Sequence, residues 1–241
     1  MVEPAPVDIA AFAAARERIL GTISDACARA GRDPAGVRLV AVSKTVPAER
    51  LVAAVAAGLT TLGENRVQEA EPKAAAVGGA TWHLIGPLQS NKARRALTTF
   101  SVIESVDSVG LAERLDRLAA EVRPGERVPV LLEVNVDGDP VKSGFAPDAL
   151  AGALPRLAEL TNLELAGLMT VGRLVERAEA ARPTFAALRE LSERLRSRLA
   201  GATALGPELS MGMSDDYPIA IEEGATIVRV GRALFGERRQ P

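Results

Sequence analysis

Lys44 is the residue of this sequence whose type and position most directly allow covalent chemistry. It follows the β-branched segment RLVAVS (38–43), and its period-two spacing from Val40 and Val42 places all three side chains on one face of a strand. Lysine is scarce, because only four of the 29 basic residues are lysines. Such a lysine either extends its ammonium to solvent or, with a lowered pKa, forms a Schiff base with an aldehyde. The strand alone leaves both alternatives open.

Two glycine-containing segments have the features of a phosphate site. Ser210-Met211-Gly212-Met213-Ser214 follows one expected strand, and Gly231-Arg232 follows the next one along the chain. Glycine lets the backbone approach a phosphate closely, and free amides at the start of a helix bind anions. A glycine at a strand end also serves simply to turn the chain, so either segment alone is a weak signal. Both together predict a phosphate site.

Arg229 lies inside the apolar segment IVRV (227–230), where an unpaired guanidinium is costly to bury. It must therefore meet a backbone carbonyl, a ligand atom or a carboxylate, and a purely structural ion pair with Glu64 or Glu133 is one alternative. A lysine, a phosphate site and a buried arginine together describe a site for an aldehyde that carries a phosphate. Pyridoxal 5′-phosphate (PLP) is the candidate ligand.

These residues need a scaffold that brings several strand ends together. After a leading helix over about residues 7–30, eight strand-like segments alternate with helical ones; the clearest are a strand over 128–136 and a long helix over 177–199. Strict alternation allows a doubly wound sheet or a closed barrel. A (β/α)₈ barrel takes ~250 residues, and the chain has 241. We therefore predict one α/β domain over 1–241, a TIM barrel over about 38–238 with an extra N-terminal helix, and a site at the C-terminal strand ends.

Composition excludes several classes of protein. A net charge of −2 gives no field for binding nucleic acid or an anionic membrane surface. One cysteine, Cys27, excludes an intramolecular disulfide, and with the single His83 it leaves too few soft ligands for zinc. The start of the chain lacks the features of a signal peptide, and no stretch of ~18 apolar residues occurs. We expect a cytoplasmic protein.

Several long motifs resemble those of the pyridoxal phosphate homeostasis protein family, which is similar to the barrel domain of alanine racemase and belongs to the fold-type III group. The matching segments extend over about residues 38–238. They are AVSKTVP (41–47), GENRVQE (63–69), WHLIGPLQSNK (82–92), IESVDS (103–108), VNVDGDPVKSGF (134–145), GLMTV (167–171), LSMGMSDDY (209–217) and VRVGRALFGER (228–238).

The resemblance implies a role for each part of the site. Lys44 would hold PLP as an internal aldimine, and Arg229 would face the pyridine nitrogen. The phosphate would be bound by Ser210, Gly231 and the amide of Arg232, with help from the SMGMS loop, which contains Met211, Gly212 and Ser214. Two residues depart from the family pattern. Arg66 stands where many relatives have tyrosine, and Arg232 stands where a small hydroxyl residue is common, so its side chain either replaces that contact by its charge or points to solvent.

Four further residues are candidate cofactor contacts. Asn65 is either a ligand or a helix N-cap with Gln68 as its reciprocal partner. His83 either packs and hydrogen-bonds below the cofactor ring or takes part in chemistry. Asn135 and Met169 are candidates because each lies at the end of an expected strand.

Three functions compete for this site. The first is a monomeric PLP-binding protein, without a dedicated reaction, that buffers PLP and delivers it to PLP-dependent apo-enzymes. The second is a weakly active amino-acid racemase. In the alanine racemase family this reaction needs a tyrosine from a further domain. The chain ends shortly after the last barrel element, and its one tyrosine, Tyr217, has no match to the catalytic one. The third is a cofactor-free Schiff-base aldolase, which leaves Arg229 unexplained. We therefore expect the first function.

Overall fold

The computed structural model describes residues 6–173, 175–198 and 205–236. Within these ranges the strands are β1 (Arg38–Val42), β2 (Thr61–Glu64), β3 (Thr81–Leu84), β4 (Val102–Val106), β5 (Val128–Glu133), β6 (Leu163–Met169), β7 (Glu208–Ser210) and β8 (Ile227–Val230). The α-helices are α1 (Pro6–Arg29), α2 (Ala48–Ala56), α3 (Val67–Ala76), α4 (Ala93–Thr99), α5 (Val109–Val122), α6 (Pro147–Ala158), α7 (Arg182–Arg196), α8 (Tyr217–Glu222) and α9 (Arg232–Phe235).

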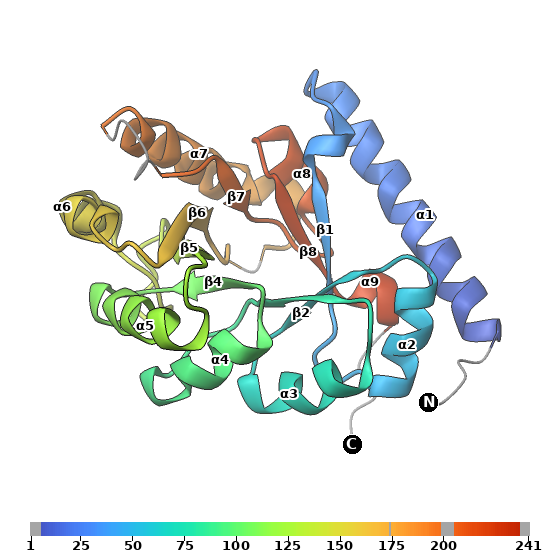
Figure 1. Ribbon diagram of the computed structural model, residues 1–241. Coiled ribbons are helices and arrows are strands. Elements are labelled where there is room, and N and C mark those ends of the chain that lie inside the picture. The colour runs from blue at the N-terminus through green and yellow to red at the C-terminus, as the bar shows by residue number, and fades with distance from the viewer. Residues whose placement is uncertain (1–5, 174, 199–204, 237–241) are drawn as a thin grey trace.

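The strands form a closed parallel barrel in chain order, from β1 through to β8. The ring closes where β8 pairs with β1, with Val40 opposite Arg229 and Ala41 opposite Val230. Figure 1 shows helices α2 to α7 arranged outside the strands, with α1 running along the side of the barrel. The predicted (β/α)₈ barrel with an extra N-terminal helix is confirmed.

The alternation of side chains along each strand separates two apolar cores. The inner core of the barrel is small, and its fully buried members are Val40, Leu131, Met169 and Ile227. The outer core lies between barrel and helices, where Ala41, Leu132 and Val228 pack with helical residues. Because side chains alternate along a strand, Val42, Glu133 and Arg229 share the inward face with this inner core.

Helix α1 covers the side of the barrel where the ring closes. It packs against α2, α8 and α9, and it buries Phe12, Ile19 and Ile23. At its C-terminal end, the Arg29 guanidinium lies 2.7 Å from the Glu222 carboxylate of α8. Arg32 then donates to the Ile221 carbonyl in the last turn of α8 at 2.5 Å and to the Ala225 carbonyl beyond that helix at 2.9 Å. These contacts attach α1 to the last part of the barrel.

Two predicted elements differ from the structure. The strand predicted over 128–136 ends at Glu133, because the chain then leaves the barrel and returns through a bridge between Val134 and Phe145. The helix predicted over 177–199 consists of a 3₁₀ turn, Ala178–Ala181, followed by α7. Its predicted end, Leu199, lies outside the described residues.

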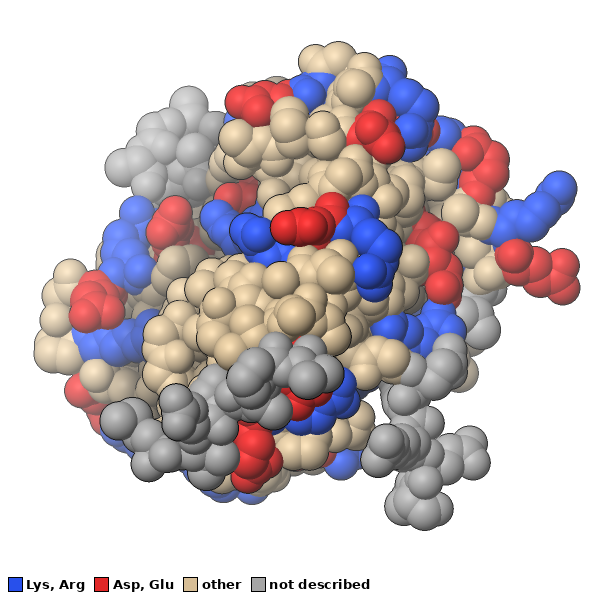
Figure 2. Space-filling model, turned by 90° about the vertical axis from the view of Figure 1, so that its right-hand side faces the viewer, with Lys and Arg blue, Asp and Glu red and all other residues tan. Residues whose placement is uncertain are grey.

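The surface carries charges of both signs. Figure 2 shows basic and acidic side chains interspersed over one face, without an extensive area of a single sign. In the part of the chain that the structure describes, no helix is long and apolar enough to cross a membrane. The same residues contain no cluster of His, Cys, Asp and Glu that could hold a metal ion.

Candidate functional site

Lys44 lies just past the end of β1, within a tight turn. The Val46 amide donates to the Ser43 carbonyl at 3.0 Å, which makes Lys44 and Thr45 the two central residues of the turn. Thr45 has a φ of +67°, a conformation that is a strained outlier for a β-branched residue. The Lys44 side chain is partly buried. The turn therefore fixes the backbone from which this lysine extends.

A cavity of about 660 Å³ connects Lys44 with the predicted phosphate site. Its lining includes Lys44 and Thr45 from the turn after β1, and Gly231 and Arg232 at the start of α9. Arg50 of α2 also lines it, and its guanidinium carbon lies 5.2 Å from the centre of the Phe12 ring. The structure thus brings two of the predicted features, the lysine and the helix start, to one cavity.

The two predicted phosphate-binding loops contact each other directly. The Gly231 amide donates to the Ser214 hydroxyl at 3.3 Å, and the Arg229 amide donates to the Gly212 carbonyl at 3.1 Å. Gly212 has a φ of +89°, and a Cβ there would lie 2.6 Å from the Cβ of Ala220, so this position requires glycine. The loops are therefore held together by the protein's own bonds.

Arg232 extends along the surface at the edge of this cavity. Its guanidinium forms an ion pair with Asp215, and both side chains are more than half exposed. The contact to Asp215 accounts for the orientation of the Arg232 side chain. Its backbone amide, at the first residue of α9, remains at the start of the helix.

Arg229 is held by hydrogen bonds inside the barrel. Its two terminal nitrogens donate to the Ser210 hydroxyl at 2.5 Å and to the Thr170 carbonyl at 2.8 Å. The Ser210 hydroxyl in turn donates to Glu104 at 2.5 Å, and the other oxygen of Glu104 lies 2.6 Å from Nδ1 of His83. The ion pair of Arg229 with Glu64 or Glu133, left open by the sequence, is not what fixes its side chain.

The charges along this network stabilise one another. Burial works to raise the pKa of Glu104, but the hydrogen bond and charge of His83, the charge of Arg229 and the Ser210 hydroxyl outweigh it and hold the pKa below its usual range. The ionised carboxylate only accepts hydrogen bonds, so Nδ1 of His83 carries the hydrogen between them. Burial also lowers the pKa of Arg229, while Glu104, Glu133 and Asp216 oppose that change. An arginine nevertheless stays protonated at neutral pH.

Among the described residues, Glu133 is a carboxylate at the inner face whose burial is not fully compensated. Its side chain is 7% exposed, and its Oε2 atom has no hydrogen-bond partner. Burial, together with the charge of Asp107, raises its pKa to about 7, although Arg229 works in the opposite direction. Glu133 therefore titrates close to neutral pH at the mouth of the barrel.

His83 lies at the far end of the network from the phosphate loops. It is buried in β3, and it borders a second cavity of about 450 Å³ among the N-terminal ends of the strands, with Thr61 and Pro129. Of the two roles that the sequence left open, the structure shows the hydrogen-bonding one, through Glu104.

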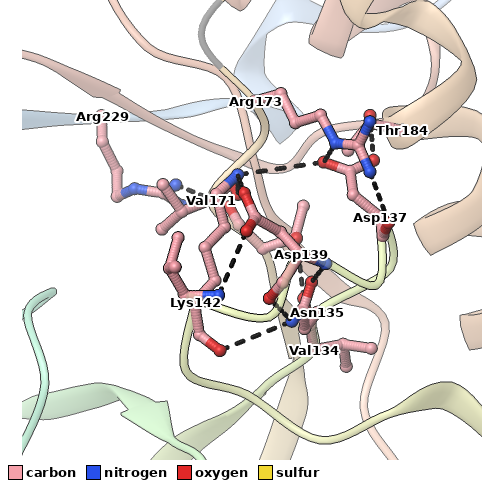
Figure 3. A network of polar contacts seen from close by, with 11 residues as sticks. Val134, Asn135, Asp137, Asp139, Lys142, Val171, Arg173, Thr184 and Arg229 are labelled. Carbon is pink, nitrogen blue, oxygen red and sulfur yellow. Dashed lines mark hydrogen bonds and ion pairs between the residues drawn. The ribbon is translucent and has the colours of Figure 1, made fainter.

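Asn135 organises the loop that follows β5. Figure 3 shows its amide between two parts of this loop: the nitrogen donates to the Asp139 carbonyl at 2.7 Å, and the oxygen accepts from the Asp139 amide at 3.0 Å. The Lys142 ammonium joins the same loop to the next one by donating to the Val171 carbonyl at 3.0 Å. Both ends of the Asn135 amide are thus occupied within the loop, and a cofactor contact remains a prediction.

Four other predicted contacts are placed differently from one another. Met169 is in the inner core of the barrel, whereas the Met211 side chain packs in the outer core, which leaves only its backbone for a ligand. Ser210 remains a predicted phosphate ligand, but its hydroxyl bonds to Glu104 and Arg229. Ser214 is the hydroxyl that the structure places at the Gly231 amide.

Asn65 directly follows β2, and the expectation that it caps a helix is wrong. Helix α3 begins at Val67, with Arg66 at the N-cap position and no side-chain hydrogen bond there. Asn65 still belongs to the strand exit, where Gly86 packs so closely that a Cβ would lie 2.5 Å from the Asn65 carbonyl. Its role as a ligand stays a prediction.

Sequence reasoning missed a buried polar cluster on the outer side of the barrel. Lys73 of α3 donates to the Glu64 carboxylate at 2.6 Å and to the Ser43 carbonyl at 2.9 Å. Glu104 was also missed as a partner of Arg229, although it lies in the apolar segment VIESV (102–106) and a buried charge there is itself a signal. No spacing in the sequence indicates the contact between Lys73 and Ser43.

Comparisons with known proteins identify relatives that match most of the chain. A family model described as the alanine racemase N-terminal domain matches residues 22–239. The pyridoxal phosphate homeostasis protein of Pseudomonas aeruginosa is 45% identical over 225 residues, which cover 92% of this chain and 93% of that protein. The protein of the same name from Escherichia coli is 38% identical over 226 residues, with 90% and 92% covered.

Solved structures show the same fold. PipY of Synechococcus elongatus, described with PLP bound, matches with a TM-score of 0.78 and 42% identity over 89% of this chain and all (100%) of that one. An alanine racemase of Clostridium difficile matches with a TM-score of 0.67 at 13% identity, over 92% of this chain and 56% of the racemase, which shows the fold alone. The chain belongs to the pyridoxal phosphate homeostasis protein family.

Proposed function

We propose that this chain binds PLP as a Schiff base on Lys44 and acts in intracellular PLP homeostasis, by holding PLP and delivering it to cofactor-free PLP enzymes. The observation that carries the proposal is the single cavity of about 660 Å³ that is lined by Lys44, Gly231 and Arg232. An amine and a helix start on one cavity match the aldehyde and the phosphate of PLP. The names of the relatives and the PLP bound to PipY support the same ligand.

The residues present fit the parts of this cofactor. Lys44 would hold the aldehyde carbon, and the amides of Gly231 and Arg232, with the Ser214 hydroxyl, would bind the phosphate. A Cβ at Gly231 would meet the Val42 side chain and carbonyl at 3.4 Å, so glycine keeps this wall of the cavity open. Arg229, fixed by Ser210 and Thr170, would lie against the pyridine nitrogen.

The same residues argue against a dedicated reaction. When bound, PLP supplies an electron sink for carbanions, and that sink depends on a protonated pyridine nitrogen. The buried cation of Arg229 disfavours this protonation. Tyr217 is the only tyrosine of the chain, and its side chain packs in the outer core at the start of α8, away from the inner face. We therefore propose a carrier in preference to a racemase, and a monomer as its oligomeric state.

The cofactor contacts are tested by trapping PLP on the protein. After PLP is added, absorbance in the visible-violet region should appear, and borohydride should fix the cofactor mass on the peptide that contains Lys44. Lys44→Ala should lose this signal but keep some noncovalent PLP, whereas Lys92→Ala, a lysine outside the cavity, should behave like the wild type. A label that remains on Lys73, Lys92 or Lys142 while Lys44 stays unlabelled would refute the site.

Delivery and catalysis need separate assays. The PLP-loaded protein should restore activity to a cofactor-free PLP enzyme, and Lys44→Ala loaded to the same extent should release PLP faster. Racemisation of alanine, serine or proline should stay near the rate of free PLP. A turnover of about 1 per second or more would place this protein among the racemases.

A further inference from the structure

We propose that Lys73 is a positioning residue for Lys44: its partly buried ammonium holds the Ser43 carbonyl and so fixes the strained turn from which Lys44 reaches the cavity. This inference rests on the proposed function, because it concerns how Lys44 is presented to an aldehyde.

The first step is the position of the Lys73 ammonium. It donates to the Ser43 carbonyl at 2.9 Å and to Oε1 of Glu64 at 2.6 Å, and its side chain is 13% exposed. Glu64 is completely buried, and its second oxygen has no partner. Removing both charges of this pair from water costs desolvation free energy, so a gain in folding stability does not by itself explain why the pair is present.

The second step is the set of bonds that converge on Ser43. Its amide donates to the Gly63 carbonyl at 2.9 Å, and its hydroxyl, which lies 3.2 Å from the same carbonyl, donates to Glu64 at 2.8 Å. Its carbonyl accepts from Lys73 and also from the Val46 amide that closes the turn. The peptide group that joins Ser43 to Lys44 is therefore fixed from outside the barrel.

The third step is strain in the turn itself. Thr45, with its φ of +67°, has a strained backbone conformation that persists only where surrounding contacts impose it. The charge-assisted bond from Lys73 is such a contact, since bonds that involve an ionised donor are stronger than neutral ones. Without it, the turn is free to relax, and the direction in which Lys44 extends changes. Misplacement of a reacting group by about 1 Å can cost about 10²-fold in rate.

Two variants separate positioning from stability. Lys73→Met leaves the Glu64 carboxylate buried without its cation, so it should lower the urea midpoint of unfolding. The double variant Lys73→Met/Glu64→Gln removes both charges and should recover much of that midpoint. Both should form the Schiff base with added PLP at least about tenfold more slowly than the wild type, measured by borohydride trapping and mass spectrometry of the Lys44 peptide. Lys92→Met is the matched control and should retain the wild-type rate.

A second measurement needs no cofactor. In the PLP-free protein, the Val46 amide should exchange its hydrogen faster in the double variant than in Lys92→Met, because its acceptor, the Ser43 carbonyl, has lost its anchor. The same exchange measurement applies to Lys73→Arg, whose guanidinium can donate to both the Ser43 carbonyl and the Glu64 carboxylate. Exchange of the Val46 amide should be slower in Lys73→Arg than in the double variant.

The outcomes distinguish this inference from the proposed function. If the wild type forms no adduct on Lys44, the proposed function fails. If the wild type is labelled on Lys44, and the folded double variant is labelled at the same rate with unchanged exchange of Val46, Lys73 has only a structural role and the inference is overturned.

Discussion

Replacing Glu133 by glutamine should stabilise the PLP-free protein by an amount that grows as pH rises from about 4 to about 7. Burial and the neighbouring Asp107 raise the pKa of Glu133 to about 7 in the folded protein, whereas an unfolded chain ionises its glutamates near pH ~4.3. The folded state therefore holds this proton more tightly than the unfolded state. The stabilisation that this proton gives the folded protein is complete below the pKa of Glu133 in the unfolded chain, and it is lost as pH rises through about 7.

The magnitude follows from the two pKa values. Each unit is worth about 1.36 kcal/mol, so ionised Glu133 costs the folded protein about 3–4 kcal/mol at pH 8. The attraction of Arg229 is already included in the raised pKa. Glutamine has nearly the same shape and carries no charge. The variant should match the wild type below pH ~4 and exceed its free energy of unfolding by about 3–4 kcal/mol at pH ~8.

Urea unfolding of the PLP-free proteins at several pH values measures this difference. Glu126→Gln, an exposed glutamate, is the matched control for loss of one negative charge, and it should show no such pH dependence. A Glu133→Gln variant that is no more stable than the wild type at pH ~8 would refute the argument. So would a gain that stays constant across the pH range, because it would show that titration of Glu133 is not its source.

Other substitutions test the cavity, the turn and the outer core. Gly231→Val should weaken PLP binding by about tenfold or more, because its branches enter the space beside Val42. Arg232→Thr should bind PLP nearly normally, since it keeps the backbone amide. Normal PLP binding by Gly231→Val in a fluorescence titration would contradict the phosphate site. Thr45→Gly should be as stable as the wild type or up to about 1 kcal/mol more stable, because glycine adopts a positive φ without strain. Thr22→Gly inside α1 should lose stability, because glycine disfavours a helix. Urea unfolding measures both differences. Leu115→Ala, fully buried in α5, should cost about 2–5 kcal/mol, and a smaller loss in thermal or urea unfolding would show that the outer core closes over the space.

Local patterns were sufficient to predict the barrel. The run of β-branched residues before Lys44, the proline that precedes α2 and the spacing of apolar residues in α5 each indicate one element, and the alternation of elements indicates the class of fold. The end of β5 could not be predicted, because Val134 and Val136 continue the apolar pattern beyond Glu133. What ends that strand is the return of Phe145, a contact that spans a loop.

The candidate site likewise has features that local sequence patterns predict and contacts that they do not. Period-two spacing predicts that Lys44 shares one face with Val40 and Val42, and each glycine signal is local. Partners that come from other strands are not encoded at any fixed spacing. Glu104 reaches Arg229 through Ser210, which is 106 residues further along the chain than Glu104. Asn65 looked like a cap because a cap and a strand exit favour the same small polar residues.

The pairing of β1 with β8 has a consequence for the order of events during synthesis. Lys44 follows the first strand, whereas Arg229, Gly231 and the start of α9 belong to the last one, and the ring closes only when these two strands meet. During translation, the chain through β7 carries Lys44 while the start of α9, the proposed phosphate site, is still missing. The proposed function therefore implies that a nascent chain cannot retain PLP as the finished protein would, and that loading follows closure of the barrel.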